Sequence, residues 1–418
     1  MSATEQQART GSPGLWVLLL TVFINLVGFG VVIPLLPFFA RSMQAPEWQI
    51  TLMFAAHSAG QFLGEPFWGR LSDRIGRKPV LLVTLALNAV GYLLLAFSPT
   101  IWAAIAARLF TGVVAGNIST IQGYVADVTP PERRAGRMGL IGGAFGLGFI
   151  VGPALGGLLT NEDAGRIGFQ IPLFVAAGLA VLAALGVLLF VRESRARAPK
   201  AEGPKPAPFA NFREASGHAV LKRVLLVTVI YMAAFSGMEA TFGLWSEARH
   251  GWGAREVGLT FMVVGVVSAI SQSLITGRLA RRFGEARVLA FGMGLFGASL
   301  VGQVIAPQPF MVPVIMAFGA FGMSLAMPNI SALISRSTPP DRQGAMLGIN
   351  MACGSLARMT GPVVAGFTYS GLGHDAPFLT GAVLVIPAVL LALDTSRVFG
   401  RLQGRPALAP AAPTPATE

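Results

Sequence analysis

Long apolar runs, separated by short polar segments, fill almost the whole chain. Twelve of these runs have close to or more than the number of mostly apolar residues that a helix needs to cross a bilayer, which is about 20. Glycine and proline recur inside the runs, and membrane helices tolerate both where neighbouring helices satisfy the backbone. The pattern therefore predicts an all-α integral membrane protein with twelve transmembrane helices, at roughly 15–38, 48–68, 79–97, 101–126, 138–160, 171–191, 221–244, 255–276, 287–306, 310–334, 344–368 and 377–394.

A polar segment rich in proline, alanine and basic residues separates the sixth run from the seventh. The first run is too long for the core of a signal peptide and lacks a small-residue cleavage site, so we expect it to be retained. The final residues are of low complexity, which predicts disorder. The expected organisation is a cytoplasmic N-terminal segment (1–14), a six-helix bundle (15–191), a cytoplasmic linker (192–220), a second six-helix bundle (221–396) and a disordered cytoplasmic tail (397–418).

Basic residues are concentrated in alternate connections between the runs. With the N-terminus placed in the cytoplasm, most of the 31 lysines and arginines fall on the cytoplasmic side. This positive-inside pattern predicts that both termini are cytoplasmic. It also accounts for the net charge of +12 without a nucleic-acid partner, and it is compatible with attraction to anionic lipids.

The two halves of the chain repeat one another. The segment TPPERRAGRMG (129–139) aligns without gaps with TPPDRQGAMLG (338–348) at an offset of 209 residues. An offset of 208 residues carries GRLSDRIGR (69–77) onto GRLARRFGE (277–285). Parallel repeats of this kind predict two pseudo-symmetric bundles with a binding cavity between them near the middle of the membrane.

Three motifs resemble those of the major facilitator superfamily. GRLSDRIGRK (69–78) resembles its signature between spans 2 and 3, and RLFTGVVAG (108–116) resembles its motif in span 4. A third segment in span 5 resembles the motif of drug/proton antiporters. The resemblance implies a monomeric, proton-coupled exporter in the bacterial inner membrane. In the third segment, GGAFGLGFIVGPALGG (142–157), the antiporter-motif residues are Gly148, Gly152, Pro153, Gly156 and Gly157.

Further segments are similar to the tetracycline/proton antiporters, among them VGFGVVIPLLP (27–37) and YVADVTPPERRAG (124–136). Three positions differ from that group. Asn25 and Phe296 stand where its members carry acidic residues, and Ser268 stands where they carry a histidine. These groups are implicated in handling a metal-chelated drug and protons, so whether tetracycline is carried stays open.

The loop between spans 2 and 3 is expected to act as a conformational latch. The carboxylate of Asp73 can favour the positive N-terminus of another helix, and the resemblance places that partner near Asp341–Gly344. A solvated loop that only obeys the positive-inside rule is the alternative. The second repeat has Arg281 in place of Asp73, so the latch is expected in one half. Its residues are Gly69, Asp73, Arg74, Gly76, Arg77 and Lys78.

Four charged residues are candidates for proton or charge coupling, because charge inside a membrane span is expensive and usually functional. They are Arg108, Glu239, Asp127 and Arg358. Glu239 shares a helix face with Met232 and Phe235, which makes it the preferred proton carrier. The alternatives are a structural hydrogen-bonding role for Arg108 and an interfacial position for Glu239. Asp127 is expected mainly to organise the loop after span 4.

The substrate cavity is expected between spans 1, 4, 7, 8, 10 and 11. An apolar lining with a few polar anchors suits an amphipathic organic molecule, exchanged for protons. The sequence shows no nucleotide-binding loop, catalytic triad or metal-ligand cluster, so we predict no cofactor, no metal and no enzyme activity. A metabolite importer or uniporter of the same fold, and a membrane-embedded receptor or enzyme, are the alternatives. The expected cavity residues are Asn25, Asn117, Gln122, Tyr231, Phe235, Gln272, Asn329 and Asn350.

Overall fold

The computed structural model describes residues 13–194, 215, 217–339 and 342–403. In this part of the chain the regular structure is entirely helical. The first half forms seven α-helices and one 3₁₀ turn, η2 (Glu162–Ala164). The α-helices are α2 (Pro13–Arg41), α3 (Glu47–Ile75), α4 (Arg77–Ala96), α5 (Ile101–Ala115), α6 (Ile118–Val128), α7 (Pro131–Leu159) and α8 (Arg166–Phe190).

The second half repeats this plan with one additional break. A π-helical turn, η3 (Ser271–Ile275), interrupts its second span. The α-helices of this half are α10 (Ala219–His250), α11 (Ala254–Ile270), α12 (Thr276–Phe283), α13 (Glu285–Ile305), α14 (Met311–Ser324), α15 (Ala326–Arg336), α16 (Gln343–Leu372) and α17 (Ala376–Gln403).

Three spans consist of consecutive pieces: α5 with α6, α14 with α15, and α11 with η3 and α12. Counted in this way, the described residues form twelve spans, which confirms the predicted fold. The break at Asn117 and the break at Leu325 are 208 residues apart, the offset of the sequence repeat. Spans 4 and 10 are therefore interrupted at equivalent places.

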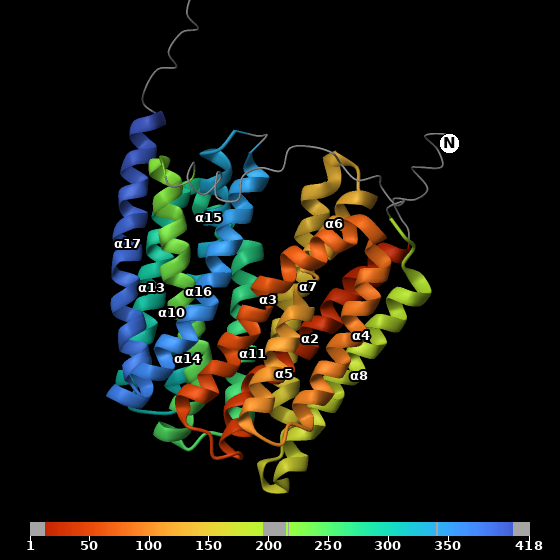
Figure 1. Ribbon diagram of the computed structural model, residues 1–418. Helices are drawn as coiled ribbons and strands as arrows, with labels where there is room; N and C mark the ends of the chain where they lie inside the picture. Colours follow the sequence, from red (N-terminus) through yellow and green to blue (C-terminus); the bar gives the residue numbers. More distant parts are fainter. Residues whose placement is uncertain (1–12, 195–214, 216, 340–341, 404–418) are drawn as a thin grey trace, which may run out of the picture.

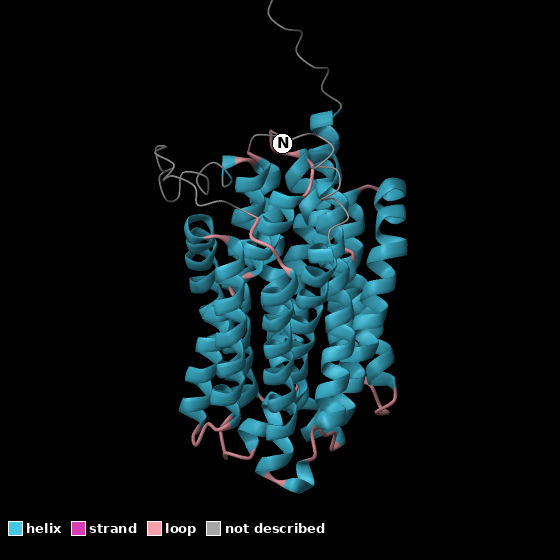
Figure 2. Ribbon diagram, turned by 90° about the vertical axis from the view of Figure 1, so that its right-hand side faces the viewer, coloured by secondary structure: helices cyan, strands magenta, loops and turns pink. Residues whose placement is uncertain are grey.

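Figure 1 shows the two halves side by side, the first in red to yellow and the second in green to blue. Figure 2 shows the same helices running along the long axis of the molecule. The start of α4 and the last turn of α17 lie at the upper end of Figure 1, which we call the linker end. The opposite end, called the far end, carries the turns at 42–46, 160–165, 251–253 and 373–375.

The halves meet mainly along two pairs of helices, α3 with α16 and α7 with α11. At the far end this contact is tight. A methyl group added to Gly366 would lie 2.0 Å from the hydroxyl oxygen of Thr51, and one added to Gly157 would lie 2.6 Å from the carbonyl oxygen of Ala254. Only glycine allows backbones to approach so closely.

Polar contacts also join the halves at the far end. The guanidinium of Arg41 lies 3.3 Å from the carboxylate of Glu247. The backbone N–H of Ala254, at the start of α11, donates a 2.8 Å hydrogen bond to Glu162. The first of these pairs is partly exposed, with 41% and 34% of the two side chains accessible, so we assign its role to geometry rather than to a large free energy. Together with the glycine contacts, these bonds close the far end.

The same helices are loosely packed toward the linker end. A methyl group added to Gly142 of α7 or to Gly348 of α16 would meet no other atom within 4 Å. Figure 1 shows the ribbons of the two halves converging toward the lower, far end. The described structure is thus closed at one end and loosely packed at the other.

Helices α3 and α16 differ from the other spans in polarity. Ten spans are long and apolar enough to qualify as membrane-crossing by composition, and these two do not. Both are as long as the others, with 29 and 30 residues. They carry polar residues in their middle turns, and these residues surround the central cavity.

Candidate functional site: the central cavity

A cavity of about 290 Å³ lies between the two halves. Its walls come from α2, α3, α4, α5, α6 and α7 on one side and from α10, α15 and α16 on the other. Apolar and sulfur-containing side chains form much of the lining, including Phe29, Phe145, Phe149, Met232, Met327 and Met351. The polar lining consists of Asn25, His57, Gln61, Glu65, Asn88, Tyr92, Gln122, Thr228, Asn350, Ser355 and Arg358.

Two hydrogen bonds hold amides in the cavity wall. In the first half, the amide nitrogen of Asn88 donates a 3.0 Å bond to the side-chain oxygen of Asn25. In the second half, the hydroxyl of Thr228 donates a 2.7 Å bond to the side-chain oxygen of Asn350. In each pair one amide oxygen is used and amide N–H groups remain for a ligand. These amides provide anchors within an otherwise apolar wall.

Helix α3 contributes a polar stripe to the cavity. His57, Gln61 and Glu65 are spaced four residues apart and therefore lie on one helix face. The amide of Gln61 donates a 3.4 Å hydrogen bond to Glu65. The ring of His57 lies 5.2 Å from the ring of Phe29, and its Nδ1 lies 3.4 Å from the hydroxyl oxygen of Thr111. The sequence interpretation missed His57, although this four-residue spacing inside an apolar helix was the signal for it.

Four charged residues from four helices lie within electrostatic range of one another, although no two of them form an ion pair among the described residues; Glu65 and Arg358 line the cavity, and Arg108 and Glu239 do not. Arg358 of α16 interacts electrostatically with Glu65 of α3 and with Glu239 of α10. Arg108 of α5 interacts electrostatically with Glu239 and with Tyr92. These two arginines and two glutamates, which we call the central charge cluster, include residues of both halves. The cluster brings together three of the four predicted charge-coupling residues.

Arg108 is the most deeply buried member of the cluster. Only 2 % of its surface is exposed, and its Nε has no hydrogen-bond partner among the described residues. A cation placed so deep is retained only where nearby charge or polar groups offset its desolvation.

Glu239 lies deeper in its helix than its sequence position indicated. Helix α10 continues to His250, so Glu239 is about three turns from the end, whereas the predicted span placed it within about two turns of the end. The residue is half-buried, and its charge partners are inside the bundle. This placement favours an internal role over an interfacial one.

Asp127 is placed elsewhere, at the linker end of α6. Its carboxylate lies 3.2 Å from the guanidinium of Arg77 and accepts a 3.3 Å hydrogen bond from the hydroxyl of Ser194. It does not belong to the central charge cluster.

Three of the eight expected cavity residues line the central cavity: Asn25, Gln122 and Asn350. Phe235 instead lines a much smaller apolar pocket between α7, α10, α11, α13 and α14. The expectation that span 8 contributes to the lining was wrong, since spans 2, 3 and 5 supply residues in its place. Gln272 falls in the π-helical turn and is exposed, which explains its absence from the wall.

The other expected residues are buried in helix contacts. Asn117 donates a 2.9 Å hydrogen bond to Thr84, which joins span 4 to span 3. Asn329 donates a 2.6 Å hydrogen bond to the carbonyl of Leu325 at the break in span 10. Tyr231 packs edge-on against Phe296, with 6.4 Å between ring centroids. Buried amides and phenols at span interfaces connect helices as often as they bind ligands.

The glycine motif of α7 has two faces. Methyl groups added to Gly148, Gly152 or Gly156 would collide with α2, the closest contact being 2.1 Å from the carbonyl oxygen of Val31. This stripe therefore packs within the first half. Gly157 lies instead against α11. Pro153 contacts both helices: its ring would lie 2.9 Å from a methyl group added to Gly30 of α2, and its carbonyl oxygen 2.4 Å from one added to Gly258 of α11. The motif thus seats α7 between its own bundle and the other half.

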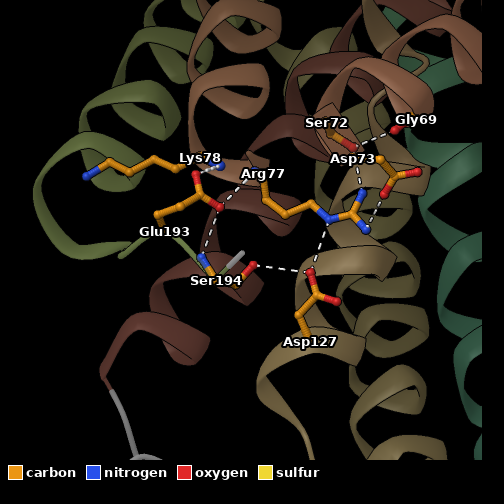
Figure 3. A network of polar contacts seen from close by, with 8 residues as sticks. All are labelled: Gly69, Ser72, Asp73, Arg77, Lys78, Asp127, Glu193 and Ser194. Atoms are coloured by element: carbon orange, nitrogen blue, oxygen red, sulfur yellow. Dashed lines mark hydrogen bonds and ion pairs between the residues drawn. The ribbon is translucent and has the colours of Figure 1, made fainter. Parts of the chain in front are cut away.

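A polar network occupies the linker end of the first half (Figure 3). Arg77 is its centre and is 7 % exposed. Its guanidinium lies 2.8 Å from Asp73 and 3.2 Å from Asp127, and it donates a 2.6 Å hydrogen bond to Ser72. The network therefore connects α3, α4 and α6 within one half.

The same network caps helix α4. Glu193, just after α8, accepts hydrogen bonds from the backbone N–H groups of Arg77 at 2.8 Å and Lys78 at 3.0 Å. A carboxylate at this position neutralises the positive end of the helix. Gly76 has a φ of 107°, which favours glycine, and it makes the sharp turn between α3 and α4 possible.

The remaining predicted latch residues lie around this network. The amine of Lys78 donates a 2.8 Å hydrogen bond to the carbonyl of Leu188. Arg74 is exposed, and Gly69 packs near Ser119. The expected latch partner begins at Asp341, which lies outside the described residues. The ion pair between Asp73 and Arg77 lies within the first half.

Known proteins match the chain over most of its length. A family model described as Major Facilitator Superfamily matches residues 18–276 and 250–415. The tetracycline resistance protein of class C from Escherichia coli is 32% identical over 380 residues, covering 88% of this chain and 94% of that protein. Multidrug resistance protein 2 of Bacillus subtilis (strain 168) is 26% identical, with 88% and 92% covered.

Solved structures agree with the fold. The human organic anion transporter MFSD10 (TETRAN) matches with a TM-score of 0.68 and 26% identity, covering 91% of this chain and 98% of the other. A bacterial homologue of the human lysosomal transporter Spinster, solved in an inward-facing and unoccupied conformation, matches with a TM-score of 0.78. It is 15% identical, with 97% and 100% of the two chains covered.

Proposed function

Because the chain belongs to the Major Facilitator Superfamily, we propose that it is a secondary transporter that exports a small hydrophobic or amphipathic compound in exchange for protons. The central cavity would face each side of the membrane in turn. Relatives named tetracycline resistance and multidrug resistance proteins support a drug-like substrate. We place the protein in a bacterial inner membrane as a monomer.

The carrying observation is the central charge cluster beside a mostly apolar cavity. The walls offer aromatic and methionine surface for an organic molecule, and amides such as Asn25 and Asn350 offer a few directional bonds. Glu65 and Glu239 both interact with Arg358. A glutamate that takes up a proton becomes neutral and no longer attracts the arginine electrostatically. Proton binding and substrate binding would therefore be coupled through the same cation.

The direction of transport follows from the distribution of basic residues and the packing of the halves. The basic loops lie at the linker end, so that end would face the cytoplasm, with both termini. The far end is closed by the contacts around Gly157 and Gly366. The described conformation would therefore receive a substrate from the cytoplasm or the inner leaflet, as an exporter requires.

An importer or a uniporter of the same fold is the main alternative. The glycine-proline motif of α7, which resembles that of antiporters, favours exchange over it. A receptor or an enzyme is the alternative from another class, and the superfamily consists of transporters rather than enzymes. Dependence on a proton gradient separates an antiporter from a uniporter.

The test is accumulation of drugs in cells that lack their own pumps. The panel contains tetracycline, fluoroquinolones and chloramphenicol, each measured with and without a protonophore. Wild-type protein is expected to lower accumulation of at least one compound, and only while the proton gradient stands. Arg108→Ala and Glu239→Gln are expected to abolish the effect, and Asp163→Asn, which changes an exposed carboxylate at the far end, is expected to leave it intact.

A decrease in drug accumulation that persists in the presence of the protonophore would contradict proton coupling and would support a uniporter. Export by Glu239→Gln at the wild-type level would remove Glu239 from the mechanism. If no compound of the panel is exported although the protein is present in the membrane, drug export is refuted for these classes. An endogenous metabolite would then be the substrate to seek.

A further inference from the structure

The polar network at the linker end has a counterpart of reversed charge in the second half. At the repeat offsets of 208 and 209 residues, Arg77 corresponds to Glu285 and Asp127 corresponds to Arg336. Arg77 pairs with Asp127, and Glu285 pairs with Arg336. Both pairs join the start of one span to the end of the next, α4 to α6 and α13 to α15. The geometry of the bridge is kept while its polarity is inverted.

The inversion changes what surrounds the start of helix α13. In the first half, the carboxylate of Glu193 accepts hydrogen bonds from the first N–H groups of α4 (Figure 3). Helix α13 also begins after a glycine of positive φ, Gly284 at 85°, and Glu285 is its first residue, but no described side chain accepts a hydrogen bond from its first N–H groups. Among the described side chains, none therefore takes the capping position that Glu193 has in the first half.

A pocket of about 380 Å³ opens at this position. Three arginines line it, Arg281, Arg287 and Arg336, together with one carboxylate, Glu285. Within the described ranges, neither Arg281 nor Arg287 has a hydrogen-bond or ion-pair partner. The remaining lining is Ala280, Phe283, Gly284, Ala286, Leu333 and Ser396.

The pocket lies at the depth of lipid headgroups. Its lining includes the ends of three candidate spans, at Phe283, Glu285 and Arg336, and Ser396 two residues before the end of a fourth. The side chain of Phe283 is exposed, and the guanidinium of Arg282 lies 5.4 Å from its ring centre. Exposed apolar surface next to arginines that lack a partner among the described residues, at a membrane boundary, is suited to an acyl chain and an anionic headgroup.

We propose that this pocket binds a phosphate group at the membrane boundary, most directly that of an anionic phospholipid. The exposed guanidinium groups of Arg281 and Arg287, which have no partner among the described residues, present N–H donors in a fork that matches phosphate oxygens. The uncapped N–H groups of α13 add the positive end of a 21-residue helix. A phosphate at this position accepts hydrogen bonds from the first N–H groups of α13, as Glu193 does from those of α4. The site is separate from the central cavity, so the proposal does not depend on transport.

Native mass spectrometry of the full-length protein tests it. Protein is reconstituted in phosphatidylcholine with an equal amount of phosphatidylglycerol, and the lipids retained after ejection are counted. Wild type is expected to retain one phosphatidylglycerol in preference to phosphatidylcholine. Arg281→Gln and Arg287→Gln are each expected to reduce that preference about tenfold, the effect of losing one charge-assisted hydrogen bond.

Arg282→Gln is the matched control, because it removes the same charge from a neighbouring residue that does not line the pocket. It is expected to keep the preference. Excess inorganic phosphate distinguishes a lipid headgroup from soluble phosphate as the source of the bound phosphate group. A site for a lipid headgroup keeps its phosphatidylglycerol when inorganic phosphate is in excess. If excess inorganic phosphate displaces the lipid from wild type, and this displacement is lost in Arg281→Gln, the result supports a soluble phosphate at the same site. An equal loss in all three variants, or no preference in wild type, would overturn the proposal, whatever the drug-accumulation assay shows.

Discussion

Asn88 donates its side-chain hydrogen bond to Asn25, and both residues line the central cavity. The related tetracycline antiporters, by the sequence resemblance, carry an acidic residue at the position of Asn25. The bond shows how an uncharged residue is held at this place. An aspartate would accept the same hydrogen bond, because only the oxygen of Asn25 is used.

We therefore predict that Asn25→Asp folds normally and gains transport of cationic or metal-chelated compounds. The added carboxylate would face the cavity, with an N–H donor from Asn88 already in place to stabilise it. The measurement is uptake of tetracycline with magnesium into inverted vesicles, beside the melting temperature in detergent. Asn25→Leu serves as the control that removes the bond without adding charge. No gain by the aspartate variant would argue that Asn25 does not meet the substrate.

The glycines of α7 predict opposite effects of the same substitution. Gly156→Leu places side-chain atoms against the Val31 backbone, so we expect a loss of about 2 kcal/mol or more in stability. Gly142→Leu meets open space in this conformation and is expected to leave the melting temperature unchanged. If the halves close at the linker end during transport, Gly142→Leu should nevertheless slow transport. Transport by Gly142→Leu at the wild-type rate would show that the halves stay apart at this part of α7 throughout the cycle.

Cross-linking tests whether the far end opens. A methyl group added to Gly366 would lie 3.2 Å from the Cβ of Thr51, slightly inside the ordinary Cβ separation of a disulfide. We predict that Thr51→Cys with Gly366→Cys, in a Cys353→Ser background, forms a disulfide that stops transport and that reductant restores it. The single cysteine variants are the controls. Full activity of the oxidised double variant would exclude opening between α3 and α16.

The bridge of Arg77 and Asp127 predicts a rescue by charge reversal. Arg77→Glu puts a third carboxylate beside Asp73 and Asp127, so a loss of about 3 kcal/mol is expected. Adding Asp127→Arg recreates the polarity that Glu285 and Arg336 have in the second half. The double variant should therefore melt above either single variant, measured by thermal unfolding in detergent. Additive losses would show that the pair does not interact energetically.

Apolar run length and the repeat were enough to predict the fold. Twelve spans and their division into halves follow from membrane thickness and need no side-chain detail. The breaks at Asn117 and Leu325 were not predicted, because both lie inside uninterrupted apolar runs. Such breaks depend on how neighbouring helices pack, and composition does not record that.

The cavity was harder to predict than the fold. Arg358, which lines the cavity, was singled out in the sequence because charge in an apolar span is conspicuous. Asn117 and Asn329 were assigned to the wall on residue type alone, whereas Asn117 bonds to the neighbouring span and Asn329 to the backbone of its own span. His57 was missed, since a single histidine shows no pattern unless its spacing to Glu65 is considered. The rotation of a helix about its axis decides whether an amide or a histidine faces a cavity or a neighbouring helix. The identity of a single residue does not reveal that rotation.

The polarity of α3 and α16 also affects how the chain is built into the membrane. Each half contains one span that is too polar to count as membrane-crossing by composition, followed by a strongly apolar one, α4 or α17. A polar span by itself partitions unfavourably from the insertion channel into lipid. Each would therefore enter the bilayer as a hairpin with the helix synthesised after it. The residues that form the cavity thus make biogenesis of the protein depend on the order in which its helices emerge from the ribosome.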